Sequence, residues 1–539
     1  MNYSKSVLSM CLIAHILQNH PSYAMQKYKP VAIAAGVAAV GTAAYAAAQK
    51  IYFNHLHWDW KKNDPKNIYI HQATTKGLDL SEWTRKEPFN TISIADFFKL
   101  RAQYLQKLSP NQNEWLWGAA TSAHQVEGDC TNNNWYLFEG KQLDGNIVQP
   151  AAQGCDTWKH EDTDIQKMKE LGINTYRFSV EWSKVFPQQG IVDQEVLNHY
   201  KEFCQKLVKN GIKPVITLYH YTEPIWFYEQ GGFEKAENIK HFVEFCTTVF
   251  NAMHKDVYAW FTFNAPEGIA LQGWLTGSKP PAKKNMKLAV EVLHNILEAH
   301  VQIYQAFKQL PGGQESRIGI LKNIMQLDPW NIANPLDHLA CYMGNKLQNE
   351  SVYNFLTTGE YSVYVPTKVH YHATNEYLKN GGKCLDFIGL NYYCHNYMKN
   401  FKPIREPNQE IEIHTNNSKY TIYAEGLYRA IAELSARIAK PLGIPIYVTE
   451  NGIGTDNDEH RTLHNQRYVY ALARAIQDGY DVRGYIHWSL MDNYEWGQYA
   501  KHYGLYAVDR NTPELTRSLK PGAQYYKDVV TNSVSKAKL

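Results

Sequence analysis

The sequence has almost no net charge and no clustered cysteines. Its 55 lysine and arginine residues and 52 aspartate and glutamate residues leave a formal net charge of +3, so no overall positive field favours a nucleic acid as partner. The eight cysteines are irregularly spaced, without a C-x-x-C pair or a tight cysteine and histidine group. This argues against a zinc site and against a disulfide-dense scaffold. We therefore expect no metal, no cofactor and no nucleic acid.

Aromatic residues, by contrast, are abundant. The chain of 539 residues is 13% aromatic, with 14 tryptophans and 38 tyrosines, which is more than a core alone normally needs. Aromatic faces pack well against the C–H faces of sugars, although large core side chains are the simpler explanation of the number alone. The length and the 44% apolar composition fit one large α/β barrel with an extension, and they exclude wholesale disorder and a collagen-like chain.

The first 24 residues have the pattern of a secretory signal peptide. Lys5 precedes an apolar run from Val7 to Leu17, and small residues at Ser22 and Ala24 stand where a signal peptidase reads the chain. A short buried helix is the alternative. If the signal peptide is correct, the body of the protein lies outside the cytoplasm.

Residues 25–50 contain a second uncharged stretch, Val31 to Ala48, which is rich in alanine and glycine. It is about long enough to span a bilayer, but alanine is a weak membrane residue, so a membrane anchor and a soluble Ala-rich helix both remain open. With an anchor the protein is tethered through its N-terminus, and without one it is secreted. Residues 51–112 follow as a linker or packing extension, with one amphipathic segment, Ile94 to Leu108.

The body of the chain, residues 113–530, shows the spacing of a (β/α)₈ TIM barrel, and residues 531–539 form a tail. Eight short apolar, β-branched or aromatic runs alternate with helical patterns, too far apart for a β-sandwich. The predicted strands are Trp115–Ala120, Thr175–Val180, Pro214–Tyr219, Ala259–Phe263, Ile318–Leu321, Phe387–Tyr392, Ile444–Val448 and Val482–Trp488.

Polar and aromatic side chains gather at the ends of these predicted strands. A barrel of this type carries its active site at the C-terminal ends of the strands. The residues found there are Gln125, Glu127, Arg177, Glu181, His220, Asn264, Asn391, Tyr393, Glu450, Asn451, Trp488 and Glu495. So many polar ends predict a functional site at the mouth of the barrel.

The same segments contain strings that resemble glycoside hydrolase family 1. They are W-L-W-G-A-A-T-S-A-H-Q-V-E-G (115–128), Y-R-F-S-V-E-W-S (176–183), T-L-Y-H (217–220), T-F-N-A-P (262–266), D-F-I-G-L-N-Y-Y (386–393), V-T-E-N-G (448–452) and W-S-L-M-D-N-Y-E-W (488–496). Seven motifs in the family's order cover essentially the whole barrel. The resemblance implies a retaining β-glycosidase of β-glucosidase type, acting on a small β-glycoside or oligosaccharide in carbohydrate metabolism.

The resemblance also implies roles for individual residues. Glu450, in V-T-E-N-G, corresponds to the nucleophile that attacks the anomeric carbon. Arg177 would keep this carboxylate ionised, and Tyr393 would donate a hydrogen bond to it. The positions that match contacts to the sugar are Gln125, His220, Asn264, Trp488, Glu495 and Trp496, with Trp488 as the platform beneath the ring. Glu495 would repel a 6-phosphate, which favours an unphosphorylated sugar.

One position departs from the family pattern. The acid/base motif of the family reads T-F-N-E-P, whereas this chain has Ala265 in place of the glutamate. General acid/base help is typically worth about 10²–10⁴-fold, so glycosides with poor leaving groups should react slowly. Three explanations stay open: an enzyme for good leaving groups or transglycosylation, a glycan-binding pseudoenzyme, and an alanine substituted into an ordinary β-glucosidase.

Glu267, two residues after Ala265, is a candidate replacement acid. A two-residue displacement beyond Pro266 would move the carboxyl by several ångströms, and the reaction tolerates little misplacement. We therefore expect Glu267 to face the aglycone side or solvent. The aglycone itself would be met by the loops Leu271–Ala282 and Met398–Thr421.

Overall fold

A computed structural model describes residues 115–331, 334–405 and 420–536 of the chain. Eight parallel strands close into a barrel in the order β1-β15-β14-β11-β7-β6-β5-β4. They are β1 (Leu116–Ala120), β4 (Thr175–Ser179), β5 (Lys213–Tyr219), β6 (Ala259–Asn264), β7 (Arg317–Asn323), β11 (Phe387–Asn391), β14 (Ile446–Asn451) and β15 (Val482–Trp488). The predicted (β/α)₈ fold is confirmed, and each barrel strand overlaps one of the eight predicted runs.

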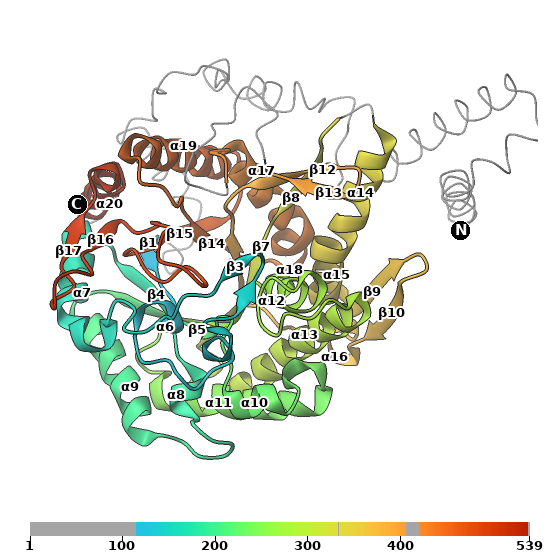
Figure 1. Cartoon of the computed structure of the whole chain (residues 1–539), viewed down its shortest axis with the longest axis horizontal. Coiled ribbons are helices and arrows are strands. Elements are labelled where there is room, and N and C mark those ends of the chain that lie inside the picture. The colour runs from blue at the N-terminus through green and yellow to red at the C-terminus, as the bar shows by residue number, and fades with distance from the viewer. Residues whose placement is uncertain (1–114, 332–333, 406–419, 537–539) are drawn as a thin grey trace, which may run out of the picture.

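Helices surround the strands (Figure 1). The longer ones are α7 (Thr157–Leu171), α9 (Gln194–Lys209), α11 (Ile239–Met253), α13 (Met286–Gln309), α14 (Pro335–Asn345), α15 (Ser351–Thr358), α17 (Glu425–Leu434), α19 (Asp458–Gln477) and α20 (Gln524–Lys536). Short helices and turns of helix are α6 (Ala123–Val126), α8 (Trp182–Val185), α10 (Ile225–Glu229), α12 (Pro266–Ala270), η6 (Leu271–Thr276), α16 (Glu376–Lys379) and α18 (Lys440–Leu442). Helix α9 shows why such segments form, because its apolar face is buried and the Asp193 carboxylate caps the first backbone N–H groups.

Small antiparallel and mixed sheets form in the segments that connect the barrel strands and helices. Strands β8 (Gln326–Pro329), β12 (His395–Lys399) and β13 (Lys402–Ile404) form a three-stranded sheet. Because β8 follows β7 and β12 follows β11, this sheet continues the chain beyond the C-terminal ends of two barrel strands. The remaining pairs are β2 (Gln142–Leu143) with β3 (Asn146–Ile147), β9 (Glu360–Val365) with β10 (Val369–Thr374), and β16 (Tyr506–Val508) with β17 (Arg517–Leu519).

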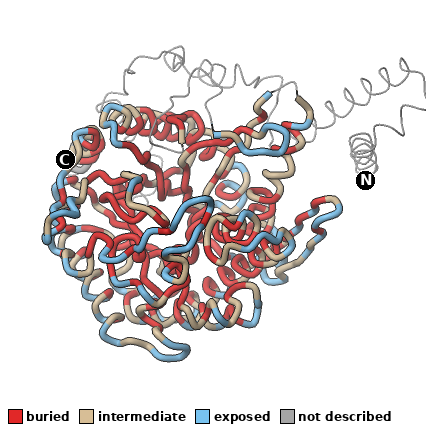
Figure 2. The backbone as a smooth tube through the Cα atoms, in the orientation of Figure 1, coloured by how far each residue is buried: buried red, intermediate tan, exposed pale blue. Residues whose placement is uncertain are grey.

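The inside of the barrel is packed rather than hollow. Figure 2 shows buried backbone through much of the molecule, with exposed segments around its rim and in the β2–β3 hairpin in front of the barrel. An apolar layer fills the interior, made of Leu116, Val215, Ala259, Phe261, Leu321, Phe387 and Tyr447. Arg177 lies over the ring of Phe261, 5.9 Å from its centroid. This layer supports the polar groups that point toward the C-terminal mouth.

The predicted N-terminal segments, residues 1–24, 25–50 and 51–112, lie outside the described residues. Within the described ranges, no helix is both long enough and apolar enough to cross a membrane.

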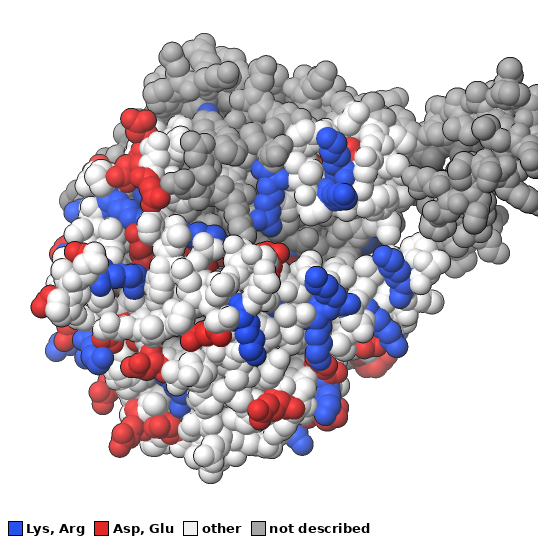
Figure 3. Space-filling view, in the orientation of Figure 1, with Lys and Arg blue, Asp and Glu red and all other residues white. Residues whose placement is uncertain are grey.

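Cationic and anionic side chains are interspersed over the face seen in Figure 3. Helix α20 runs into the predicted tail at 531–539 and ends at Lys536. Thr531 stays helical, since its hydroxyl donates to the carbonyl of Lys527 and its methyl packs on Gly172.

Candidate active site

A cavity of about 710 Å³ opens at the C-terminal ends of the barrel strands. This volume lies in the range of sites that bind small molecules. Its wall includes these predicted site residues: Ala265, Glu450, Tyr393, His220, Asn264, Trp488, Glu495 and Trp496. The two other predicted residues, Gln125 and Arg177, are fully buried behind the wall. Strands β5, β6, β11, β14 and β15 thus bring together residues that are far apart in the sequence.

Glu450, at the end of β14, is held by donors on both carboxylate oxygens. Arg177 donates to Oε1 over 2.6 Å, and the Tyr393 hydroxyl donates to Oε2 over 2.7 Å. Only 5% of Glu450 is exposed, so these charge-assisted bonds offset much of the cost of burying the carboxylate. Burial and the adjacent Glu450 raise the pKa of Tyr393 well above its usual value. Tyr393 therefore keeps its proton and remains a donor.

The guanidinium of Arg177 organises the floor of the cavity. Besides Glu450, it donates to the Thr217 hydroxyl over 2.9 Å and to the Asn264 amide oxygen over 2.9 Å. The Asn264 amide nitrogen in turn lies 3.0 Å from Nε2 of His220. Burial, with the charge of Arg177 next, lowers the pKa of His220 well below its usual value. His220 is therefore neutral and serves as a hydrogen-bonding group rather than a charge.

Glu495 and Trp488 form a second polar group on the wall. The indole N–H of Trp488 donates to Glu495 Oε1 over 2.9 Å. Burial raises the pKa of Glu495 to about 7, so this carboxyl can both donate and accept hydrogen bonds near neutral pH. Such a group suits the hydroxyls of a sugar.

Stacked rings form an aromatic face beside these carboxyls. The His220 ring lies 5.6 Å from that of Trp488 and 5.9 Å from that of Trp496, stacked in both cases. Tyr221, which directly follows His220, meets the Trp496 ring edge-on at 5.1 Å. Sequence reasoning did not single out Tyr221, although its place one residue after a predicted site histidine was a signal.

Gln125 occupies a supporting position. Its side-chain nitrogen donates to Asn493 Oδ1 over 3.0 Å and to the Tyr494 carbonyl over 2.8 Å. Its oxygen accepts from the Ser122 hydroxyl over 2.6 Å. In this structure Gln125 therefore fixes the segment that carries Glu495 and does not reach the cavity.

Close backbone packing sets the position of the V-T-E-N-G motif. A Cβ atom at Gly452 would lie 1.8 Å from the carbonyl oxygen of Trp488. Only glycine permits this approach. The end of β14, which bears Glu450, is consequently held against the end of β15, which bears Trp488.

Ala265 lies between β6 and α12, as the N-cap residue of that helix. Its backbone has φ of +51°, and its N–H donates to the Leu321 carbonyl over 2.9 Å. One helical turn later, a Cβ atom at Gly268 would lie only 2.8 Å from the Tyr221 hydroxyl, so this hydroxyl fills the space beside Gly268. The cavity thus offers a carboxylate held by donors at Glu450 and only a methyl group at Ala265.

Glu267 lines the cavity beside the residues of the loop assigned to the aglycone, and it does not face solvent. It is 1% exposed, and its Oε1 accepts from the backbone N–H of Asn323 over 2.8 Å and pairs with Lys322 Nζ at 3.2 Å. Lys322 is itself fully buried on β7. What local chain direction did not predict is the ion pair, because α12 packs against β7 and β7 carries the buried Lys322.

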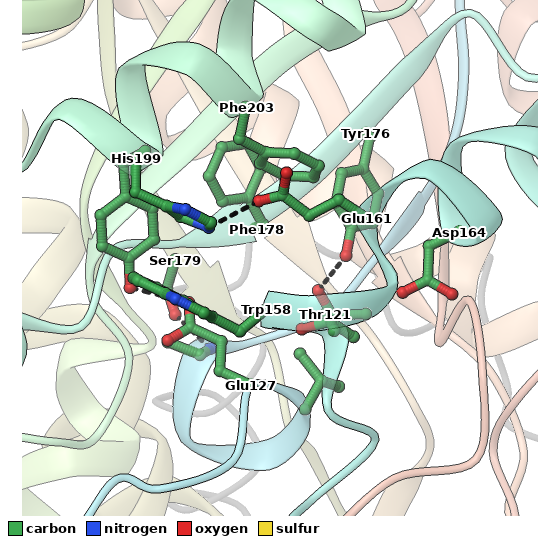
Figure 4. A pocket seen from close by; sticks show the side chains of 14 residues that line it. Thr121, Glu127, Trp158, Glu161, Asp164, Tyr176, Phe178, Ser179, His199 and Phe203 are labelled. Atoms are coloured by element: carbon green, nitrogen blue, oxygen red, sulfur yellow. Dashed lines mark hydrogen bonds and ion pairs between the residues drawn. The ribbon is translucent and has the colours of Figure 1, made fainter. Parts of the chain in front are cut away.

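Two of the polar strand ends, Glu127 and Glu181, do not line this cavity, and the Glu181 carboxylate accepts from the Ser183 and Thr222 hydroxyls instead. Glu127 accepts from the Tyr200 hydroxyl over 2.7 Å and pairs with Lys184 at 3.0 Å. It lines a separate cavity of about 30 Å³ beside α7 and α9, shown in Figure 4, where the rings of Trp158 and His199 stack at 3.9 Å. This volume is too small for a sugar, so the polar groups there stabilise the packing of helices on the barrel.

Lys279 is a further residue on the cavity wall that sequence reasoning missed. It lies in the loop Leu271–Ala282, which was assigned only to the aglycone. The available signal was a single cation in a segment otherwise free of charged residues.

Comparisons with known proteins agree with this geometry. The sequence profile of Glycosyl hydrolase family 1 matches residues 109–534. Beta-glucosidase A of Acetivibrio thermocellus is 30% identical over 451 residues, which cover 78% of this chain and 98% of that protein. A beta-glycosidase from Pyrococcus horikoshii superposes with a TM-score of 0.67 at 31% identity, over 77% of this chain and 93% of its own. A beta-glucosidase from Thermotoga maritima, solved in complex with deoxynojirimycin, gives 0.67 at 25% identity, over 78% and 98%.

Proposed function

Because the chain belongs to glycosyl hydrolase family 1, whose members hydrolyse β-glycosides, we propose that it cleaves unphosphorylated β-glucoside-like substrates with retention of configuration. The observation that carries this proposal is the Glu450 carboxylate, which lines the cavity with both oxygens held by donors. In a retaining reaction a carboxylate attacks the anomeric carbon to form a glycosyl-enzyme, which water then hydrolyses. Glu450 is the nucleophile in this scheme, and the hydrogen bonds from Arg177 and Tyr393 hold its carboxylate in place.

The sugar would occupy the space between the aromatic face and the floor. His220, Asn264, Glu495 and Trp496 are the candidates for hydrogen bonds to its hydroxyls, with the Trp488 ring beneath it. Buried polar contacts of this kind discriminate strongly, because an analogue without the hydroxyl leaves them unpaired. Glu495 disfavours a 6-phosphate, since its ionised form would repel the phosphate charge.

The methyl group of Ala265 limits which substrates react well. A leaving group that is stable as an anion departs without a proton, whereas an alkoxide does not. Deglycosylation is slow for the same reason, because Ala265 cannot activate water. The enzyme is therefore specialised for good leaving groups, or for transfer to an acceptor that needs no base. The second candidate, a glycan-binding pseudoenzyme, is favoured by this same alanine.

A pre-steady-state experiment separates these two functions. With 2,4-dinitrophenyl β-glucoside we expect a burst of one dinitrophenolate per chain, slow turnover, and a glycosyl group on Glu450 detected by peptide mass spectrometry. Azide should accelerate turnover and give the β-glycosyl azide, the anomer formed by a second inversion. Glu450→Gln is the matched control and should show no burst. Glucoside binding without any burst in the unmodified chain would favour the pseudoenzyme.

For the N-terminus, we propose export by residues 1–24, with residues 25–50 as an anchor if they span the membrane. The support is the order of Lys5, the apolar run and the small residues before the predicted cleavage point. A reporter fused to residues 1–24 or to residues 1–50 tests both steps. A reporter that stays in the cytoplasm with either fusion would contradict the proposal.

A further inference from the structure

We propose that Lys279 supplies the proton that Ala265 lacks, so that the site works with an ammonium group as its general acid. This inference rests on the proposed role of Glu450 as nucleophile. It adds a second cavity-lining residue from the connection between β6 and α13, which also carries Ala265.

The loop holds Lys279 in a fixed place. Its backbone N–H donates to the carbonyl of Gln272 in η6 over 3.2 Å, and Lys283 N–H donates to the Gly273 carbonyl over 2.9 Å. At the base of the loop, the Lys283 amine and the Trp274 indole both bond to Glu234 Oε1, at 2.5 and 2.7 Å. These bonds tie the loop to the helical segment that follows Ala265.

The amine lies in the angle between two rings of the cavity wall. Nζ is 3.3 Å from the centroid of the Tyr221 ring and 5.2 Å from that of Trp496. The Tyr221 hydroxyl lies 2.8 Å from where a Cβ atom would stand at Gly268, in the first turn after Ala265. The amine therefore lies over a ring that extends toward the vacant acid/base position. Within the described ranges, no carboxylate forms a direct ion pair with Lys279, which leaves its protons available to a substrate.

The surroundings make this ammonium a stronger acid than an ordinary lysine. Burial among the rings lowers its pKa to about 7, against the attraction of Glu450 and Glu495 and with help from the charge of Lys501. A general acid works best when its pKa lies near the working pH. Lysine pKa values shift readily on burial, which is why lysines serve as catalytic bases elsewhere.

The proton balance closes over the two steps. In the first, Glu450 bonds to the anomeric carbon, the bond to the leaving oxygen breaks, and a Lys279 proton passes to that oxygen, leaving an alcohol and a neutral amine. In the second, the amine takes a proton from water as the water oxygen bonds to the anomeric carbon and Glu450 departs. The ammonium and the carboxylate are both restored.

The other acidic groups near Ala265 fit this role less well. Glu267 also lines the cavity, but its Oε1 is engaged by Asn323 and Lys322, and its Oε2 is buried without a hydrogen-bond partner. Burial, with Glu450 and Glu267 next, raises the pKa of Tyr221 well above its usual value. Tyr221 therefore holds its proton too tightly to act as the acid, and Glu267 is committed to its ion pair with Lys322.

The test compares two substrates in two variants. Lys279→Met should lower kcat/KM for an alkyl β-glucoside by about 10-fold or more, the minimum expected for loss of a general acid. The burst rate with 2,4-dinitrophenyl β-glucoside should stay within about twofold, because that leaving group needs no proton. The exposed Lys284, five residues on, gives the matched control Lys284→Met, which should leave both rates unchanged. In the unmodified chain, alkyl glucoside cleavage should fall as the pH rises through about 7, and Lys279→Met should lose this limb.

A double-mutant cycle separates proton donation from a structural role. In an Ala265→Glu background the carboxyl replaces the amine, so Lys279→Met should have little further effect on the alkyl substrate. Equal losses for both substrates or in both backgrounds would overturn the inference, as would an unmodified chain that shows a burst but no alkyl glucoside cleavage. Absence of the burst in the unmodified chain would instead refute the proposed function itself.

Discussion

Restoring the family carboxyl by Ala265→Glu is a direct test of how much the missing group costs. The backbone at residue 265 already has φ of +51° and its N–H is bonded to the Leu321 carbonyl. The left-handed conformation is about equally costly for alanine and glutamate, so the substitution adds a side chain without a new backbone demand. That side chain would extend into the cavity, where Ala265 already forms part of the wall.

The expected gain follows from the value of general acid catalysis. A factor of about 10²–10⁴ corresponds to about 3–5.5 kcal/mol of transition-state stabilisation. We expect the lower end, about 10²-fold for alkyl β-glucosides, because Lys279 already provides part of this help. For activated aryl glucosides the first step should change little, while release of the glycosyl group from Glu450 should accelerate.

A series of aryl β-glucosides of graded leaving-group acidity measures this. Because Lys279 provides only part of the proton donation, the unmodified chain should show a steeper dependence of kcat/KM on leaving-group pKa than Ala265→Glu. Ala265→Gln has the same size as the glutamate variant but no proton to give, so it should keep the dependence of the unmodified chain. If the glutamate and glutamine variants behave alike, or if neither differs from alanine, residue 265 is not the acid/base position and the reasoning fails.

Three further perturbations probe the site. Tyr393→Phe removes the hydroxyl bonded to Glu450 over 2.7 Å, a charge-assisted bond of about 1.5–3 kcal/mol, so the burst rate should fall about 10- to 100-fold in stopped-flow measurements while the fold is kept. Burial raises the pKa of Glu495 to about 7. Between about pH 5 and pH 8 the folded chain therefore retains a proton that the unfolded chain has released. The free energy of unfolding should fall as the pH rises through this range. Glu495→Gln should flatten that fall in urea titrations, and an unchanged slope would contradict the assignment. Gly452→Ala would force a Cβ to within 1.8 Å of the Trp488 carbonyl, so unfolding should become easier by about 2 kcal/mol or more; a loss below 0.5 kcal/mol would show that the strands part easily.

The strands were predictable because their signal is local. Apolar runs such as Val482–Trp488 and Pro214–Tyr219 carry the pattern of strands buried on both faces, and the structure places barrel strands at Val482–Trp488 and Lys213–Tyr219. Boundaries were less certain: the run predicted to end at Val448 continues to Asn451. The extension comes from pairing with β11 and β15, which no local pattern encodes.

Side-chain direction was not predictable to the same degree. Gln125 and Glu127 stand two residues apart on the same turn of chain, yet the first bonds to the segment before Glu495 and the second to Lys184 near α9. Glu267 likewise turned toward Lys322, a partner 55 residues away in the sequence. Each outcome depends on a long-range neighbour, and motif strings record only the residues themselves.

The packed apolar layer beneath Arg177 also determines the path by which substrate and products enter and leave the cavity. Since Leu116, Phe261 and Phe387 fill the barrel axis, the cavity has no exit through the base of the barrel, and everything must pass the C-terminal mouth. The released aglycone and the incoming acceptor must therefore pass through the same C-terminal mouth, one after the other. On the proposed mechanism, a small alcohol held at the mouth would compete with water for the glycosyl group on Glu450, and the aglycone could return and reverse the first step.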